Sequence, residues 1–387
     1  MEGLTVLDFS TIVAGPWATR LMADSGARVI KIETAGEGDL LRFAPPVVDG
    51  ASRVFAQFNR GKESVVLDLK AAADREIVLR LIEGADVLVE NFRPGVMGRL
   101  GLGYAQASAR NPKLVYCSVS GFGQDGPLAA AAAYAPVVHA MSGFDHAMAA
   151  ARRGSSADGG EAPAPAGVMI ADVVAAAYAF GAVQSALLRR ERFGVGAYVD
   201  VTLMESMMSL VGIQYQEAQA QRPHRSTTFP PTRTADGYIT VPLVTPRNYA
   251  ALFALIGVPD GIDPQTPARP GALAAHAPAI SARLAEWCAE RTCADCADHM
   301  HAAGLACGVH ATPAAVLDHP HLAAREAFGS LRDAEGTFVV LNPPFRMKDT
   351  PRAAPAFVAR LGEHTNSVVA AVGARPPPAL RPELERS

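Results

Sequence analysis

One carboxylate stands out because of the residues around it. The twelve residues from Val168 to Ala179 contain eleven apolar or small side chains and a single acid, Asp172. Gly167 and the prolines before it indicate a loop, and the Ala-rich run after Asp172 predicts a buried helix. Asp172 is therefore expected at or near a helix N-terminus, where N–H groups and the helix dipole favour an anion. Two interpretations remain open: an N-cap aspartate, or a nucleophile that attacks an acyl group.

A second group of reactive side chains lies at Cys293, Cys296, His299 and His301. The spacing is similar to part of a zinc site, but no second ligand pair follows at the usual distance. Thr292 is a suitable N-cap and Gly304 ends the segment, so the pattern also predicts one short helix. We favour this structural interpretation and expect no metal site. The five cysteines of the chain are an odd number, which favours free thiols over a disulfide framework.

Two features of the sequence are typical of dinucleotide-binding proteins, but each is weak evidence for a dinucleotide site. Glu33 ends the second predicted strand, where such a fold places its ribose-binding acid, but the first turn contains only Gly15. Residues 121–126 match G-x-G-x-x-G, yet they lie far from the first turn and are followed by Pro127. We expect a tight loop before a helix there, with a dinucleotide site as the alternative.

Composition excludes several broad classes of protein. The 387 residues are 49% hydrophobic and 19% charged, with a formal net charge of −3. This balance is typical of a folded chain and provides no general attraction to nucleic acid or to anionic membranes. The first residues lack the basic start and apolar core of a secretion signal, and the long apolar runs are interrupted by polar residues. We expect a soluble, cytoplasmic protein that binds neither nucleic acid nor membrane.

The order of predicted elements indicates an α/β fold. A strand at 6–10, a helix at 17–25 and a strand at 27–33 form a βαβ unit, which requires parallel strands. Further strands are predicted at 64–69, 87–90, 114–119 and 199–203. From residue 237 a smaller α+β region begins, and a hairpin follows residue 331. The Gly-, Ser- and Pro-rich loop 152–165 is interpreted either as a lid beside Asp172 or as a surface insertion.

Many segments of the chain resemble the class III CoA-transferase family, which includes formyl-CoA and carnitine CoA-transferases and alpha-methylacyl-CoA racemases. The segments span nearly the whole chain in order: VLDFSTIVAGPWATRLMADSGARVIKIE, GEGDLLR, FNRGKESVVLDLK, ADVLVENFRPGVMGRLGLGY, VYCSVSGFGQDGP, the Asp172 segment, GVGAYVDVTLMES, RTADGY, AGLACGV and LGEHT. The resemblance implies a Rossmann-like large domain built from both chain ends, a smaller α+β domain and an interlocked homodimer. The ranges we expect are 1–218 and 331–387 for the large domain, 219–236 for a linker and 237–330 for the small domain.

The resemblance also implies a mechanism and a set of site residues. Asp172 matches the catalytic aspartate of the family, which would form an acyl anhydride and then an aspartyl-CoA thioester. An acyl-CoA and a carboxylic acid would be the substrates, with coenzyme A as a substrate rather than a permanently bound cofactor. The positions that match CoA contacts in the family are Val13, Ala14, Asn59, Arg60, Lys62, Asn91, Phe92, Arg93 and Arg99.

Three positions at which this sequence differs from branches of the family reduce the number of activities that we expect. Formyl-CoA transferases have glutamine at the position of Val13 and glutamate at the position of Ala135, so a formyl or oxalate specificity is not expected. The racemases have histidine at the position of Tyr134, and racemisation needs two bases on opposite faces of the alpha carbon. His139 lies five residues further on, about 140° further round a helix. We therefore prefer a transferase, and keep a racemase and a CoA-binding protein without turnover as alternatives.

Overall fold

The computed structural model describes residues 1–152, 163, 165–220, 229–263, 273, 276–348 and 355–373. The chain divides into two compact units. The large unit contains Met1–His146, Ala162–Gly212 and Ala323–Ser387, and the small unit contains Ala147–Glu161 and Ile213–Leu322. Most of the predicted lid at 152–165 lies outside the described residues. The domain ranges expected from the sequence stay a prediction.

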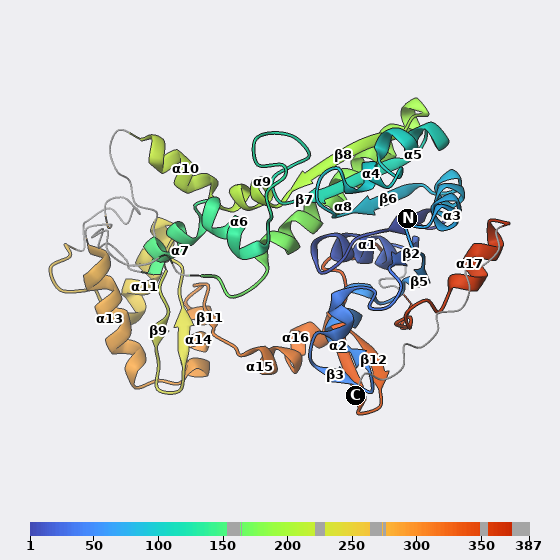
Figure 1. Ribbon diagram of the computed structural model, residues 1–387. Coiled ribbons are helices and arrows are strands. Elements are labelled where there is room, and N and C mark those ends of the chain that lie inside the picture. Colours follow the sequence, from blue (N-terminus) through green and yellow to red (C-terminus); the bar gives the residue numbers. More distant parts are fainter. Residues whose placement is uncertain are drawn as a thin grey trace, which may run out of the picture. The chain divides into compact units, whose positions relative to one another are not determined.

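The large unit is built on a six-stranded sheet in which every pair of neighbours is parallel. This finding confirms the predicted α/β class with a parallel central sheet (Figure 1). The order from edge to edge is β5 (Glu63–Val66), β2 (Arg28–Glu33), β1 (Thr5–Asp8), β6 (Val87–Glu90), β7 (Val115–Ser120) and β8 (Ala197–Thr202).

Helices cover both faces of this sheet, which explains why its strands are apolar runs rather than alternating patterns. Helices α1 (Ala14–Asp24) and α8 (Ile170–Phe193) pack against each other and against strands of the sheet. On the opposite face, one hydrophobic cluster joins the strands to α3 (Ala72–Glu83), α5 (Tyr104–Arg110) and α17 (Thr365–Ala371).

The C-terminal return segment is bound to the N-terminal part of the large unit by buried charge. Arg20 and Arg60 both pair with Asp24, and each also donates to the return segment, at the Leu341 carbonyl and the Asn342 side chain. Elements not yet named in this unit are η1 (Leu40–Phe43), β3 (Val47–Val48), β4 (Ala51–Ser52), α2 (Arg53–Asn59), α4 (Val96–Arg99), α6 (Ala135–Met141), α9 (Leu203–Met208), η2 (Ser209–Val211), β12 (Phe328–Asp333) and β13 (Gly336–Leu341). Helix α7 (Phe144–Arg152) begins in the large unit and continues into the small unit. Strands β12 and β13 form the hairpin predicted after residue 331.

The small unit has a three-stranded antiparallel sheet with helices packed around one apolar core. Cys293 and Cys296 lie in this core, on a helix capped by the Thr292 hydroxyl, as the structural interpretation of that segment expects. The elements, some of which continue into the connections to the large unit, are α10 (Gly212–Gln219), β9 (Thr232–Arg233), β10 (Tyr238–Thr240), α11 (Pro246–Ile256), α13 (Ala277–Ala289), α14 (Cys293–Ala302), β11 (Gly308–Val309), α15 (Pro313–Leu317) and α16 (Pro320–Ala324).

Helix α8 buries only one of its sides. Ala175 and Ala179 face the interior, whereas Val173, Tyr178 and Leu188 are exposed, so the helix predicted to be buried is buried on one side only in the single chain. By length and composition alone α8 could cross a membrane. Its contacts with α1, β7, β8 and α9 instead make it a structural helix of the large unit.

The close approach of α1 to the preceding loop depends on a glycine. A Cβ at Gly15 would lie 2.1 Å from the Ser10 Cβ. We therefore expect Gly15→Ala to lower the free energy of unfolding by about 1–3 kcal/mol through overpacking. Gly181→Ala is the matched control, because a Cβ at this helical position meets nothing within 4 Å. The control should gain about 0.5–1 kcal/mol in helix stability. Equal effects of both changes in denaturant unfolding would contradict the close contact.

Candidate active site

Asp172 lies in the first turn of α8, but it is not the N-cap. Helix α8 begins at Ile170, its N-cap is Met169, and no side chain of the N-cap residue caps it. The N-cap interpretation is therefore wrong. The carboxylate is partly buried, and its own N–H and the N–H of Ala14 lie close enough to it to lower its pKa. Burial raises the pKa of Asp172 to about 6, and these two donors oppose the rise.

The Ala14 N–H is available because Ala14 is the first residue of α1. The first N–H groups of a helix have no acceptor within the helix and carry partial positive charge. Val13 is the N-cap of α1 and provides no side-chain cap. The Asp172 carboxylate thus lies where the first turns of α1 and α8 meet. The Val13 side chain is fully buried in a cluster with Leu41 and Phe55.

The sheet places this meeting point at its topological switch. Strand β1 has β2 on one side and β6 on the other, so the loops after β1 and β6 leave in opposite directions. Asn91, directly after β6, joins the two loops: its side chain accepts from the Thr11 N–H at 2.8 Å and donates to the Thr11 carbonyl at 2.8 Å. Ligands of open α/β sheets bind outside the strand ends at such a point.

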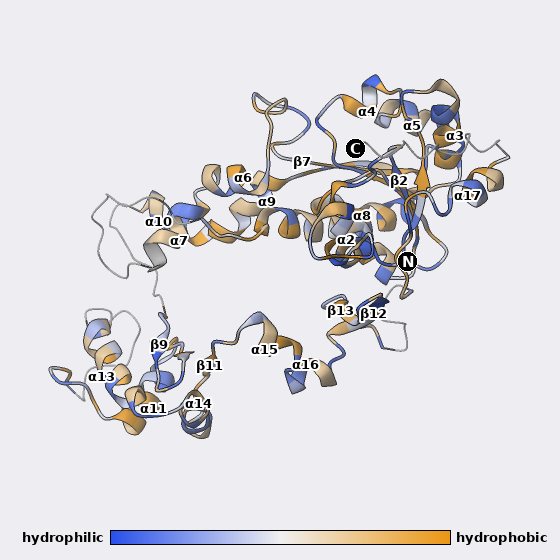
Figure 2. Ribbon diagram, turned by 60° about the horizontal axis from the view of Figure 1, so that its bottom comes forward, coloured by the Kyte–Doolittle hydropathy of each residue, from blue (hydrophilic) through white to orange (hydrophobic). Residues whose placement is uncertain are grey.

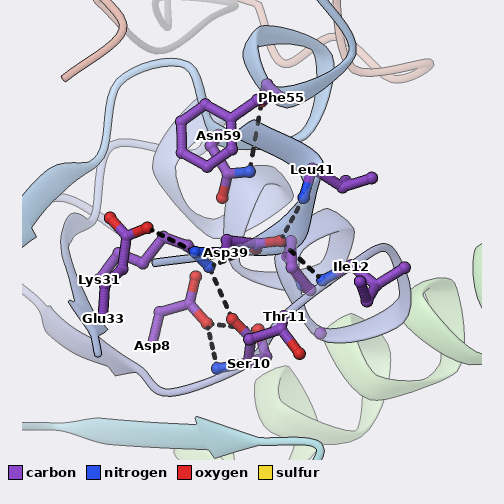
Figure 3. A network of polar contacts seen from close by, with 12 residues as sticks. Asp8, Ser10, Thr11, Ile12, Lys31, Glu33, Asp39, Leu41, Phe55 and Asn59 are labelled. Carbon is purple, nitrogen blue, oxygen red and sulfur yellow. Dashed lines mark hydrogen bonds and ion pairs between the residues drawn. The ribbon is translucent and has the colours of Figure 1, made fainter. Parts of the chain in front are cut away.

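A buried polar network holds the loop between β1 and α1 in place (Figure 3). Asp8 accepts from the N–H and the hydroxyl of Ser10, and Lys31 donates to the Ser10 carbonyl at 2.6 Å. Asp39 accepts from the Ile12 N–H at 3.2 Å and pairs with Lys31 at 3.0 Å. Ile12 has φ 68°, a left-handed conformation that is strained for a β-branched residue. The network therefore compensates the strain that turns the chain into α1.

Three predicted CoA contacts belong to buried networks of this kind. Lys62 donates to Asp8, to the Asn59 side chain and to the Pro16 carbonyl, at 2.8–2.9 Å. Arg60 pairs with Asp24 and also reaches the return segment. Burial alone would raise the pKa of Asp8, but the ammonium groups of Lys62 and Lys31 outweigh it and hold that pKa well below its usual value. Contact of Asn59, Arg60 or Lys62 with CoA stays a prediction. In this structure the Lys62 ammonium, the Asn59 side chain and Arg60 Nη2 have internal partners, whereas the buried Arg60 Nε has no hydrogen-bond partner among the described residues.

The remaining predicted contacts follow β6. Phe92 is partly buried against the sheet's hydrophobic cluster, and its N–H donates to Glu90 at 2.8 Å. Arg93 and Arg99 are exposed, and neither forms an ion pair with another residue in the described ranges. Together with Val13, Ala14 and Asn91, these residues share the switch point but not the buried network.

Three other features of the large unit contain none of the predicted site residues: a cavity, the loop at 121–126 and Glu33. A cavity of about 410 Å³ lies between α2, the β12–β13 hairpin and residues 356–361, and no predicted site residue lines it. The loop at 121–126 connects β7 to α6 and is tied to β8 by a hydrogen bond from the Gln124 N–H to Asp200. Glu33 is occupied by Arg42 and Ser64, so it is engaged in the protein's interior. Within the described part of the chain, no group of three or more His, Cys, Asp or Glu side chains is arranged to hold a metal.

Sequence reasoning missed two contributions to the site. Lys31 and Asp39 were not singled out, because nothing local indicates that a lysine inside a strand will meet the carboxylate of a later loop. His139 accepts from the Ala171 N–H at 3.1 Å, next to the predicted nucleophile. In the sequence this histidine lies five residues after Tyr134, the position of the racemase histidine, and nothing there indicates the contact with Ala171.

Comparisons with known proteins identify the family of the chain. Residues 1–365 match CoA-transferase family III. The chain is 35% identical to the acetyl-CoA:oxalate CoA-transferase of Acetobacter aceti, over 84% of each protein. It is 30% identical to the succinate–glutarate CoA-transferase of Agrobacterium fabrum, over 96% of this chain and 95% of that one.

Solved structures show the same relationship. A CAIB/BAIF family protein from Brucella suis superposes with a TM-score of 0.79 at 29% identity, over 96% of this chain and 98% of that one. A hypothetical protein from Mycobacterium tuberculosis gives a TM-score of 0.81 at 31% identity, over 95% and 98%. The fold and the sequence matches define a transferase class that uses CoA thioesters. The chain belongs to CoA-transferase family III.

An experiment can decide whether Lys62 stabilises the fold through Asp8 or contacts the CoA substrate. Lys62→Met leaves the Asp8 carboxylate buried without its main partner, so we expect a loss of about 3–5 kcal/mol in the free energy of unfolding. The control is Arg28→Met, which breaks an exposed pair with Glu63 and should cost about 0–1 kcal/mol. If Lys62→Met unfolds like the wild type while its KM for acyl-CoA rises, Lys62 is a ligand contact instead.

Proposed function

We propose that this protein moves CoA from an acyl-CoA donor to a carboxylic acid, with Asp172 as the nucleophile. The observation that supports this most strongly is the position of the carboxylate: partly exposed, in the first turn of α8, and close to the Ala14 N–H at the start of α1. An aspartate used only for stability would be expected to have a salt-bridge partner or to cap its helix. Asp172 is not the N-cap, and the donors that act on its pKa are backbone N–H groups.

The proposed reaction proceeds through four nucleophilic attacks, each of which forms one bond and breaks another. The Asp172 carboxylate attacks the donor thioester, the C–S bond breaks, and an anhydride and CoA thiolate form. The thiolate attacks the Asp172 carbonyl, which releases the donor acid and leaves an aspartyl-CoA thioester. The acceptor carboxylate attacks that thioester and forms a second anhydride, and the thiolate then takes the acceptor's acyl group. Covalent catalysis divides one difficult transfer into easier steps.

The N–H of Ala14 has a defined part in this scheme. Each attack on a carbonyl places negative charge on oxygen, and a fixed N–H at a helix N-terminus stabilises such charge. When Asp172 is itself acylated, its carbonyl oxygen becomes the acceptor for this donor. The strained turn at Ile12 and the network beneath it would keep the donor fixed throughout the cycle.

For CoA, we propose the switch point between β1 and β6. Arg93 and Arg99 are the exposed cations of the loops after β6, suited to a diphosphate or a ribose phosphate. Val13, Ala14 and Asn91 would border the pantetheine arm, and Phe92 would contribute apolar surface. Asn59, Arg60 and Lys62 would support this site from beneath through the contacts with Asp8 and Asp24.

A dicarboxylic acid is the acceptor class that we propose. The relatives are named for oxalate, glutarate, L-malate and mesaconate, each of which carries two carboxyl groups. Formyl-CoA transferases have glutamine where this chain has Val13. The Val13 side chain is buried against Leu41, so we propose that this difference alters packing and not a group that faces Asp172. Oxalate therefore belongs in the panel of acids to be tested, alongside longer dicarboxylates and hydroxy acids.

The contacts of His139 disfavour the racemase alternative. A second base would have to reach the alpha carbon of a substrate bound at Asp172. His139 is buried, and its Nε2 is engaged by the Ala171 N–H. Tyr134 occupies the position where the racemases have histidine, and a neutral phenol is a poor base at neutral pH.

We also propose that two copies of the chain form an interlocked dimer in the cytoplasm. Large apolar side chains are exposed over neighbouring elements of the large unit, and hydrophobic residues show in orange along α6 and α9 in Figure 2. Several large apolar side chains exposed on neighbouring elements are a feature expected of an interface. The exposed residues include Val137, Met141, Val173, Tyr178, Leu188, Phe193 and Leu210.

The nucleophile is tested by trapping. The wild type incubated with an acyl-CoA and then hydroxylamine or borohydride should carry its modification on the peptide that contains Asp172. Asp172→Asn should lose CoA exchange by roughly four orders of magnitude or more, because the amide has no comparable nucleophilic oxygen. Asp260→Asn, an exposed aspartate of the small unit, should retain full activity. Modification of any other peptide would refute the assignment.

The raised pKa of Asp172 predicts the acid limb of the pH profile. The carboxylate is nucleophilic only when ionised, so kcat/KM should fall as the pH drops through about 6 and reach a plateau above it. An unperturbed aspartate would instead give a limb near pH 4. Measurement of kcat/KM between the two values, with the stability of the protein checked at each pH, distinguishes them. A profile flat down to about pH 4.5 would contradict the buried setting.

The dimer is tested by mass and by subunit exchange. Light scattering should give twice the chain mass of 40.5 kDa. Chains linked through one another cannot separate without unfolding, so tagged and untagged dimers mixed under native conditions should form no mixed dimers. Mixing after unfolding and refolding should form them. A monomer mass would exclude the dimer, and rapid native exchange would exclude the interlocking.

A further inference from the structure

The beginning of α8 has an unusual set of partners for its N–H groups. The first N–H groups of a helix need acceptors from outside the helix. Ile170 donates to the Val168 carbonyl at 3.0 Å, and the Asp172 N–H lies close to its own carboxylate and lowers the pKa of that group. The Ala171 N–H, between these two, donates to His139 Nε2 at 3.1 Å. A side chain 32 residues earlier thus supplies the cap that Met169 lacks.

His139 is built into this position. It lies on α6, is 3% exposed, and its ring packs against Phe144 with centroids 5.7 Å apart. An Nε2 that accepts a hydrogen bond carries no proton, so the proton of the neutral ring is on Nδ1. Burial lowers the pKa of His139, against the opposing charge of Asp145, and this favours the neutral ring that can accept.

We propose that His139 is a positioning residue for the nucleophile: by accepting the Ala171 N–H, it fixes the first turn of α8 and keeps the Asp172 carboxylate directed at the Ala14 N–H. This inference rests on the proposed function of Asp172. Without the imidazole, the Ala171 N–H loses its acceptor, and in the proposal the carboxylate of the next residue, Asp172, takes that place. That hydrogen bond would turn the carboxylate back onto its own helix, stabilise the anion and weaken it as a nucleophile.

Two variants separate positioning from packing. His139→Phe keeps the size and aromatic contact with Phe144 but removes the acceptor. His139→Gln places a carbonyl oxygen near the position of Nε2. We expect His139→Phe to lower kcat by about 10–100-fold, with KM for acyl-CoA changed less than about twofold, because the substrate site is intact while the attacking oxygen is misplaced. The acid limb of kcat/KM should move to lower pH in His139→Phe, and His139→Gln should restore most of kcat. Thermal unfolding of the two variants should be similar.

Two kinetic results would show that His139 does not position Asp172. If His139→Phe keeps wild-type kcat, or if both variants lose kcat equally together with thermal stability, His139 only packs. A spectroscopic measurement keeps this test independent of turnover. Nitrogen NMR of the wild type should show Nε2 of His139 unprotonated and Nδ1 protonated, and carbon NMR should show a lower pKa for the Asp172 carboxyl in His139→Phe. If the wild type moves no CoA, the proposed function fails, while these spectra still decide whether His139 controls Asp172. A protonated Nε2 or an unchanged Asp172 pKa would overturn the inference.

Discussion

The structure depends on the meeting of two helix N-termini at one carboxylate. Helix α1 has to begin at Ala14 and α8 near Met169 for the Ala14 N–H and Asp172 to lie together. That requires a strained left-handed turn at Ile12 and a glycine at position 15, where any Cβ would collide with Ser10. Backbone strain of this kind persists only where the surroundings fix it. Here the residues that fix the turn are the buried polar side chains Asp8, Lys31 and Asp39.

Charge balance makes such a network tolerable. Removing charges from water is costly, and attraction between them compensates only when geometry and hydrogen bonds are complete. Lys62 has three acceptors, and Asp8 receives donors from Ser10, Thr19 and Lys62. Ion pairs of this kind add little to stability compared with apolar packing, but they specify one arrangement of a loop. The buried cations Lys62 and Arg60 therefore differ from the exposed Arg93 and Arg99, which form no ion pair with another described residue.

Local patterns predicted the elements better than the contacts. Strand β6 lies at the predicted residues 87–90, because a short apolar run between helical segments has few alternatives. Helix α1 starts three residues before the predicted 17–25, since Gly15 and Pro16 look like a loop although proline is acceptable in a first turn. Lys62 as the partner of Asp8, and His139 as the cap of α8, depend on residues 54 and 32 positions away. Spacing along the sequence carries no information on such contacts.

In the proposed cycle, the Asp172 carboxylate bonds covalently to both acids during each turnover. The most direct measurement uses an acceptor acid labelled with heavy oxygen in its carboxyl group. In the proposed cycle the second anhydride breaks on the acceptor side, so one labelled oxygen stays on the protein. After many turnovers, mass spectrometry should find heavy oxygen in the peptide that contains Asp172 and in no other. Rapid CoA transfer with an unlabelled Asp172 peptide would contradict the account.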